Sequence, residues 1–262
     1  MESVNYDLSQ VRSIIGGFHF KKDRYHDLVF YNSNENLSKL FSGIDLKDKE
    51  ILSVLASSDQ LFYFYDNGAK LVDTFDKNKL TFYYFYLRKW FIQYKNKYYI
   101  TNVNRRSLFK LLSSIKASTE DEEEALYFWK SMIDTYDIKS IFDLFIFDEN
   151  IKKNTIRNCK RIKEKLEENK LTFYNVDISK RFRLNKKYDV IYKSNISDYV
   201  CNSREVLETY RDNFDSLLKD DGIIISSNLT HDYDYSNEFG VFSEKFNYRL
   251  LNNSIGYVYT RR

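Results

Sequence analysis

The sequence has no proline and only seven glycines in 262 residues. Its two cysteines, Cys159 and Cys201, lie far apart, and the three histidines form no cluster, so neither a disulfide framework nor a zinc site is predicted. No apolar run approaches the length of a membrane span, and the first residues are polar and acidic, where a signal peptide would be basic and apolar. We therefore expect a soluble protein of the reducing cytoplasm.

Charge gives little indication of a partner, because a charged fraction of 30% leaves a net charge of only +3. The abundance of Tyr, Phe, Asn and Lys matches the codons of an AT-rich genome. Aromatic residues interleaved with lysine are typical of proteins that bind single-stranded nucleic acid. Here the interleaving runs along the whole chain, so a nucleic-acid role is not favoured.

The stretch from Glu50 to Tyr94 predicts a βαβα unit. Its expected parts are a strand (Ile51 to Leu55), a turn (Ala56, Ser57, Ser58 and Asp59), a helix, a second strand (Lys70 to Phe75) that ends in Asp76, and a long helix. Open α/β sheets bind ligands beyond the carboxyl ends of such parallel strands. Asp76 follows the serine turn at the spacing, about 20 residues, of an acid that accepts hydrogen bonds from the ribose hydroxyls of an adenosine-containing cofactor.

The segments on either side of this unit are expected to be largely helical. Residues 1 to 49 form an amino-terminal extension with a helix near Asn34 to Phe41, capped by Asn34. This extension fits a lid over the ligand site and a plain structural arm equally well. Residues 98 to 168 contain several helical stretches, the middle one with an acidic start that suits the helix dipole. They predict a helical insertion between the second and third strands.

A second organised block follows the insertion. Its expected elements are a strand from Leu171 to Val176 before Asp177, a strand from Tyr188 to Tyr192 before Lys193, Ser194 and Asn195, a helix from Ser203 to Lys219 capped by Ser203, and a strand from Ile223 to Ser227. Aromatic residues around Asn252 and Asn253 predict a closing antiparallel hairpin. The fold class is therefore α/β, a Rossmann-like doubly wound sheet with a carboxyl-terminal antiparallel hairpin and a helical insertion, in a single domain of residues 1 to 262.

This order of elements resembles the class I S-adenosylmethionine-dependent methyltransferase fold. More narrowly, LASSDQLFYFYDNGAKLVDTFDKNKL is similar to the cofactor region of the betaine-lipid-forming 3-amino-3-carboxypropyltransferases and their uncharacterised bacterial relatives. Asp76, Lys77 and Asn78 match the Asp-x-Asn of that family, and Phe128 with Trp129 matches a Phe-Trp pair in its helical insertion. The resemblance covers roughly Leu37 to Asn228.

The resemblance implies S-adenosylmethionine as cofactor and assigns a role to each matching residue. The cofactor-binding set is Ala56, Ser57, Ser58 and Asp59 around the methionine part, Asp76 on the ribose hydroxyls, Asn78 in support of that loop, Asp177 with Ile178 at the adenine, and Ser194 near the sulfonium. The catalytic set is Asn195 beside the acceptor, with Asp198 or Tyr199 assisting proton removal and Tyr199 closing over the site. Each acid taken alone also fits a solvated loop.

One departure concerns the turn after the first strand, where the family pattern has glycine and this chain has Ser57 and Ser58. A serine held in the left-handed region costs on the order of 1–2 kcal/mol, roughly tenfold in affinity if nothing offsets it. Three functions remain open: methyl transfer to a small-molecule acceptor, 3-amino-3-carboxypropyl transfer from the same cofactor, and a non-catalytic protein that binds cofactor or a partner. The acceptor and the oligomeric state are not encoded in any pattern that we can identify.

Overall fold

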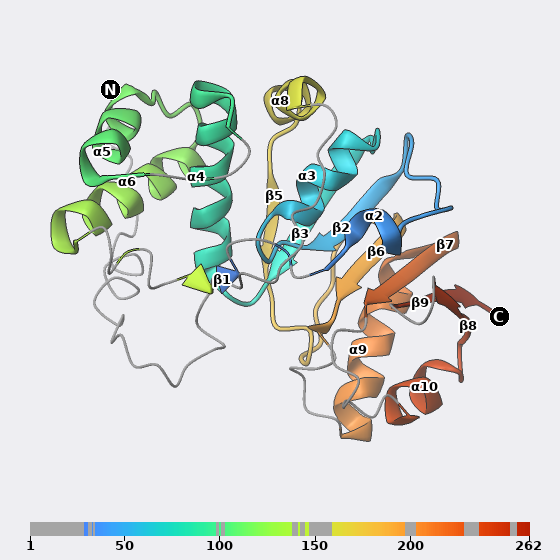
Figure 1. Cartoon of the computed structure of the whole chain (residues 1–262). Coiled ribbons are helices and arrows are strands. Elements are labelled where there is room, and N and C mark those ends of the chain that lie inside the picture. The colour runs from blue at the N-terminus through green and yellow to red at the C-terminus, as the bar shows by residue number, and fades with distance from the viewer. Residues whose placement is uncertain are drawn as a thin grey trace. The chain divides into compact units, whose positions relative to one another are not determined.

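The computed structural model of the chain describes residues 29–30, 33, 35–97, 100, 103–137, 141, 145–146, 159–196, 203–227, 236–251 and 256–262. The chain divides into two compact units (Figure 1). The sheet unit comprises residues 32–77 and 148–262, and the helical unit comprises residues 1–31 and 78–147. Within the described part of the chain, no helix is both long enough and apolar enough to cross a membrane.

The sheet unit is built on a seven-stranded sheet of order β5-β3-β2-β6-β7-β9-β8. The strands are β2 (Glu50–Val54), β3 (Leu71–Asp76), β5 (Thr172–Asn175), β6 (Tyr188–Ser194), β7 (Leu218–Ser227), β8 (Phe246–Leu251) and β9 (Gly256–Arg261). The first five in that order are parallel neighbours, while β9 runs antiparallel to both β7 and β8. This arrangement confirms the predicted doubly wound α/β sheet with a carboxyl-terminal antiparallel hairpin.

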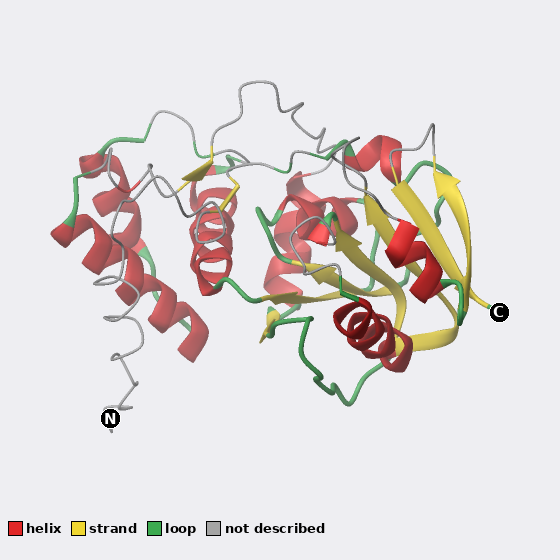
Figure 2. Cartoon of the chain, turned by 90° about the horizontal axis from the view of Figure 1, so that it is seen from below, coloured by secondary structure: helices red, strands yellow, loops and turns green. Residues whose placement is uncertain are grey.

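Helices cover both faces of this sheet, which leaves its central strands almost wholly buried. Figure 1 shows α3 (Asp59–Asp66) and α8 (Cys159–Glu168) on one face, and α9 (Arg204–Leu217) and α10 (Ser236–Phe242) on the other. A short helix, α2 (Leu37–Leu40), precedes β2. Figure 2 shows the twist of the sheet, with its strands in yellow.

The helical unit consists of α4 (Lys79–Lys95), α5 (Arg105–Ser114) and α6 (Glu120–Thr135), with β1 (Val29–Phe30) paired in parallel to β4 (Phe145–Ile146). The rings of Tyr83 and Phe128 stack with centroids 4.1 Å apart, and Trp129 donates from Nε1 to the Tyr83 carbonyl over 2.7 Å. Both residues of the Phe-Trp pair are fully buried. The pair therefore holds α6 against α4.

Several boundaries differ from the sequence prediction. Helix α4, expected in the core βαβα unit, belongs to the helical unit, whereas α8, expected in the insertion, belongs to the sheet unit and packs on α3. The cap of α2 is Asn36, whose side chain accepts from the Lys39 amide, and Asn34 lies outside the described residues. That the whole chain forms one folding domain stays a prediction.

Strand β7 starts five residues earlier than expected, so Asp220, Asp221 and Gly222, expected between the helix and the strand, lie within it. The pairing of β6 with β7 shifts register here, from Tyr188 opposite Leu218 to Val190 opposite Ile223. A Cβ atom on Gly222 would lie 3.0 Å from the Tyr188 carbonyl oxygen. The glycine therefore allows a close approach of the two strands at a bulge.

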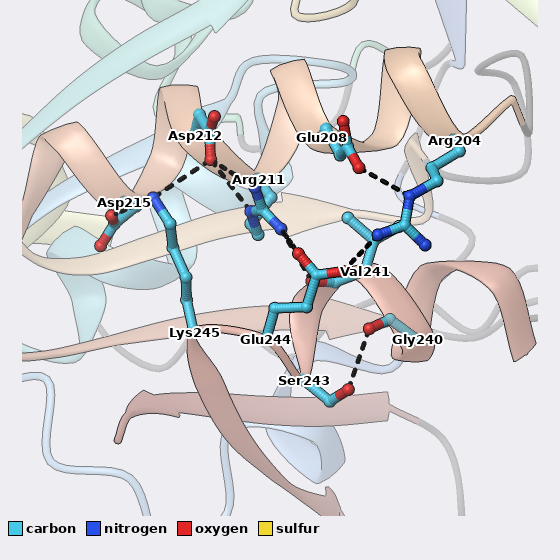
Figure 3. A network of polar contacts seen from close by, with 10 residues as sticks. All are labelled: Arg204, Glu208, Arg211, Asp212, Asp215, Gly240, Val241, Ser243, Glu244 and Lys245. Carbon is cyan, nitrogen blue, oxygen red and sulfur yellow. Dashed lines mark hydrogen bonds and ion pairs between the residues drawn. The ribbon is translucent and has the colours of Figure 1, made fainter.

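Ion pairs join α9 to the segment around α10 (Figure 3). Arg211, on α9, is buried and donates to the Val241 carbonyl over 3.1 Å and to the Glu244 carboxylate. Lys245 lies 3.1 Å from Asp212 and 2.9 Å from Asp215. These contacts fix the helices on this face of the sheet.

Candidate functional site

The candidate site lies at the carboxyl ends of β2 and β6, which are adjacent in the sheet. The chain leaves β2 toward β3 and β5 on one side, and leaves β6 toward β7 on the other, so the strand order reverses between β2 and β6. Ligands of open α/β sheets bind at such a switch point. The residues predicted to bind cofactor follow the ends of β2, β3, β5 and β6.

The turn after β2 adopts a left-handed backbone without glycine. Ala56 has φ 41° and Ser58 has φ 70°, and the Ser58 amide donates to the Leu55 carbonyl over 2.7 Å. The Ser58 side chain is 0% exposed, and its hydroxyl has no hydrogen-bond partner among the described residues. The Ser57 hydroxyl donates to the buried Asp59 carboxylate over 3.3 Å. A tight turn thus leads directly into α3.

Asp76, the last residue of β3, is joined to this turn. Its Oδ2 accepts from the Ala56 amide over 3.1 Å, and its carbonyl accepts from the Asn175 side chain over 2.9 Å. The same Asn175 amide donates to the Lys77 carbonyl over 3.1 Å. The structure therefore brings together the two parts of the chain that the sequence paired by spacing alone. It also adds Asn175, which the sequence analysis did not identify.

Asn78, predicted to support this loop, is the first residue of the helical unit. Its side chain accepts from the Leu80 amide over 3.0 Å and so caps the amino terminus of α4. The observed contact is a helix cap, and a role toward cofactor stays a prediction.

Asp177 and Ile178 follow β5, on the same edge of the sheet. The Asp177 carboxylate accepts from the Ser179 amide over 3.0 Å and from its hydroxyl over 2.7 Å. Burial opposes ionisation, but these hydrogen bonds, with Lys77 and Lys180 nearby, hold the pKa of Asp177 below its usual value. Ile178 is buried in the core that α9 covers. Asp177 is thus an ionised acceptor at neutral pH.

Ser194 and Asn195 lie at the end of β6. Ser194 has φ 54°, a third left-handed position at this edge, and its hydroxyl lies 3.1 Å from the Asn195 carbonyl oxygen Oδ1. Both side chains are buried. Backbone strain of this kind gathers at functional sites. The other two predicted catalytic residues, Asp198 and Tyr199, lie outside the described residues.

The sequence analysis missed Glu35, a carboxylate that is 4% exposed. It accepts hydrogen bonds from the hydroxyls of Ser194 and Ser227, which end β6 and β7, and from the hydroxyl of Tyr192 within β6. Glu35 stands in a polar stretch before α2, where the sequence shows an ordinary first-turn acid. No pattern in the sequence separates it from the exposed polar residues Asn36 and Ser38 nearby.

Lys193 was also misjudged, because it was expected just beyond the end of a strand. Strand β6 continues through it, and Lys193 is 0% exposed, with Nζ 2.9 Å from Glu238 of α10. Tyr259 donates to the same Glu238 oxygen over 3.0 Å. Since side chains alternate along a strand, Lys193 points to the face opposite Tyr192 and Ser194. Lys193 therefore packs against α10 and does not belong to the candidate site.

The polar groups at the carboxyl ends of these strands fit a nucleoside cofactor. Vicinal hydroxyls need an acceptor as partner, which the carboxylate of Asp76 supplies. The unpartnered hydroxyl of buried Ser58 is a polar group for which a ligand would provide a partner. Across the described ranges, no group of His, Cys, Asp and Glu side chains has the arrangement of a metal site.

Comparison with known proteins gives similarity in structure only, since no family model and no curated protein sequence matches the chain. A TehB-like SAM-dependent methyltransferase from Corynebacterium glutamicum is 10% identical with a TM-score of 0.47, over 97% of this chain and 95% of that one. The PH0226 protein from Pyrococcus horikoshii is 11% identical with a TM-score of 0.47, over 92% and 100%. The N-methyltransferase NodS from Bradyrhizobium japonicum is 9% identical with a TM-score of 0.40, over 86% and 89%.

Proposed function

We propose that this protein is an S-adenosylmethionine-dependent transferase that moves a methyl group to a small-molecule acceptor. The observation that carries the proposal is the contact between Asp76 and the Ala56 amide, which joins an acid after the second strand to the turn after the first, beside the switch point of the sheet. An acid in an ordinary solvated loop would not be expected to accept a hydrogen bond from this turn.

In this proposal each element at the edge binds one part of the cofactor. Asp76 accepts from the ribose hydroxyls, and the turn from Ala56 to Asp59 encloses the methionine part. Asp177 with Ile178 faces the adenine, where a carboxylate accepts from the exocyclic amine. Ser194 and Asn195 lie next to the reacting groups, with Asp198 or Tyr199 removing a proton from the acceptor.

The bound cofactor supplies a methyl group already activated on a sulfonium. The protein's own work is therefore to align the acceptor with one carbon–sulfur bond and to exclude water. Left-handed backbone at Ser58 and Ser194 aids this alignment, because residues held rigidly at a site need little reorganisation when ligand binds. Aminocarboxypropyl transfer would use the same residues with the acceptor placed opposite a different carbon.

Calorimetric titration with S-adenosylmethionine and S-adenosylhomocysteine tests the proposal. Asp76→Asn keeps an oxygen that can accept from the Ala56 amide but loses the charge that strengthens hydrogen bonds from ribose. We expect it to weaken binding of both ligands by about tenfold to a hundredfold. Asp221→Ala, which removes an exposed acid near the start of β7, is the matched control and should bind like the wild type. Absence of heat with either ligand at high micromolar wild-type protein would refute the proposal.

Product analysis distinguishes the two transfers. S-Adenosylhomocysteine indicates methyl transfer, and methylthioadenosine indicates aminocarboxypropyl transfer. Cofactor binding without either product, across a panel of amine and thiol acceptors, would favour the non-catalytic alternative.

A further inference from the structure

Glu35 is a buried carboxylate held only by neutral groups. Its Oε1 accepts from the hydroxyls of Ser194 and Ser227, and its Oε2 accepts from the Tyr192 hydroxyl. The Ser33 hydroxyl, 3.3 Å away, and the Gln60 amide, 3.4 Å away, complete the shell around Oε2. These donors satisfy the lone pairs without adding a positive charge.

The donors to Glu35 are all neutral groups. Burial, and next the carboxylate of Glu35, raise the pKa of Tyr192 well above its usual value, so its hydroxyl stays protonated and donates. No lysine, arginine or histidine among the described residues forms an ion pair with Glu35. Burying an unpaired charge is costly, and buried charges are usually paired.

Two other buried carboxylates of the sheet unit are paired with lysine. Glu238 is paired with Lys193 at 2.9 Å, and Asp73 with Lys186 at 2.7 Å. Glu35 differs from both because its partners are neutral. Two of them, Ser194 and Ser227, also stand at the carboxyl ends of strands. The carboxyl group of Glu35 thus lies on the side of the sheet where ligand is proposed to bind.

The contacts of Glu35 fix this position further. Ser194 ends β6, Ser227 ends β7, and Gln60 lies in the first turn of α3, directly after the turn proposed for the methionine part. The carboxylate therefore lies between the turn after β2 and the residues proposed to face the sulfonium. A cationic ligand bound there would feel its field in a poorly screened environment.

We propose that Glu35 is the counter-charge of this site and makes it select the cationic cofactor over its neutral product. The inference rests on the proposed function. S-Adenosylmethionine carries a sulfonium cation, whereas S-adenosylhomocysteine is a neutral thioether and otherwise nearly identical. A fixed negative charge therefore stabilises the first ligand and leaves the second almost unaffected, which favours exchange of product for fresh cofactor.

The test compares the affinities of both ligands for the full chain and for Glu35→Gln by calorimetry. We expect the substitution to weaken S-adenosylmethionine binding by about tenfold or more and to change S-adenosylhomocysteine binding by less than about threefold. The double substitution Lys193→Met with Glu238→Gln is the matched control, since it makes the same change at a buried carboxylate but removes the paired lysine as well and so leaves the net charge unchanged. It should leave the ratio of the two affinities at its wild-type value.

Each other outcome is informative. Equal weakening of both ligands would show that Glu35 only supports the fold, and would overturn the inference while the proposed function stands. Failure of the wild type to bind either ligand would remove the proposed function, and this inference with it. If Glu35→Gln does not fold, the wild type alone decides, by comparing sinefungin, whose amine cation replaces the sulfonium methyl, with S-adenosylhomocysteine. Tighter binding of sinefungin supports the counter-charge, and equal or weaker binding overturns it.

Discussion

Ser58→Gly is expected to stabilise the protein, although it removes a fully buried side chain. Ser58 stands in the left-handed region with φ 70°, where its Cβ is unfavourable. Its hydroxyl is buried and lacks a hydrogen-bond partner. Glycine adopts this conformation without strain and brings no hydroxyl to bury. The substitution therefore removes two unfavourable contributions at one position.

The magnitude follows from four contributions to the free energy of unfolding. Relief of the left-handed conformation gives roughly 1–2 kcal/mol, and loss of the unpartnered hydroxyl gives about 1–3 kcal/mol. Against these, glycine makes the unfolded chain more flexible, which costs about 0.5–1 kcal/mol, and loss of the buried carbon costs about 0.8 kcal/mol. We expect a net stabilisation of about 1–2 kcal/mol, with the melting temperature raised by about 2–4 °C for each kcal/mol.

Urea unfolding monitored by circular dichroism measures this change as a higher midpoint at an unchanged slope. Ser57→Gly is the matched control, because Ser57 is also fully buried in the same turn but keeps a negative φ and donates to Asp59. It should lower stability by about 1–2 kcal/mol. Ser58→Ala, which removes the hydroxyl but keeps the strain, should stabilise by a similar amount, because the strain that glycine relieves about equals its cost in chain flexibility and lost carbon. Destabilisation by Ser58→Gly as large as that by Ser57→Gly would refute the reasoning.

Two further predictions concern buried and half-buried charges of the sheet unit. Lys193→Met should lower stability by about 3–5 kcal/mol, because it leaves Glu238 buried and unpaired, and adding Glu238→Gln should restore most of that loss in the same urea titration. Asp215 pairs with Lys245 and Arg261; burial opposes its ionisation, but these contacts lower its pKa. Because the pKa is depressed in the folded state, its stabilisation is complete above the unfolded value near 4 and is lost as pH falls through the folded value. Unfolding midpoints of Asp215→Asn should thus lie below those of the wild type at pH 7 and converge with them at about pH 2–3, and parallel curves would contradict this.

The strands were predictable because burial on both faces leaves a strong local signal. β2, β3 and β6 read as short apolar runs that end in polar residues, and each was found within two residues of its observed limits. The spacing of Asp76 from the serine turn carried real information as well, since a βαβ unit of this length brings the two ends together. Ser203 was likewise found as the cap of α9.

Contacts between distant segments were not predictable. The partners of Glu35 lie up to 192 residues away along the chain, and a polar stretch with an acid gives no hint of them. Lys193 looked like the first residue of a loop, because a lysine inside a buried strand is unexpected until its partner on α10 is known. The sequence predicted a long helix after Asp76, but not that α4 belongs to the helical unit.

The backbone conformation shows whether the strain in the glycine-free turn affects ligand affinity or the stability of the fold. From sequence, serine in place of glycine threatens affinity, because a ligand would have to force the turn into a left-handed conformation. In the structure, Ala56 and Ser58 already have positive φ, and hydrogen bonds to Asp76 and Leu55 hold the turn. The cost of the strain therefore falls on the stability of the fold, whether or not ligand is bound. Ser58→Gly should accordingly raise the melting temperature, and any loss of cofactor affinity should come from the missing hydroxyl and not from the backbone.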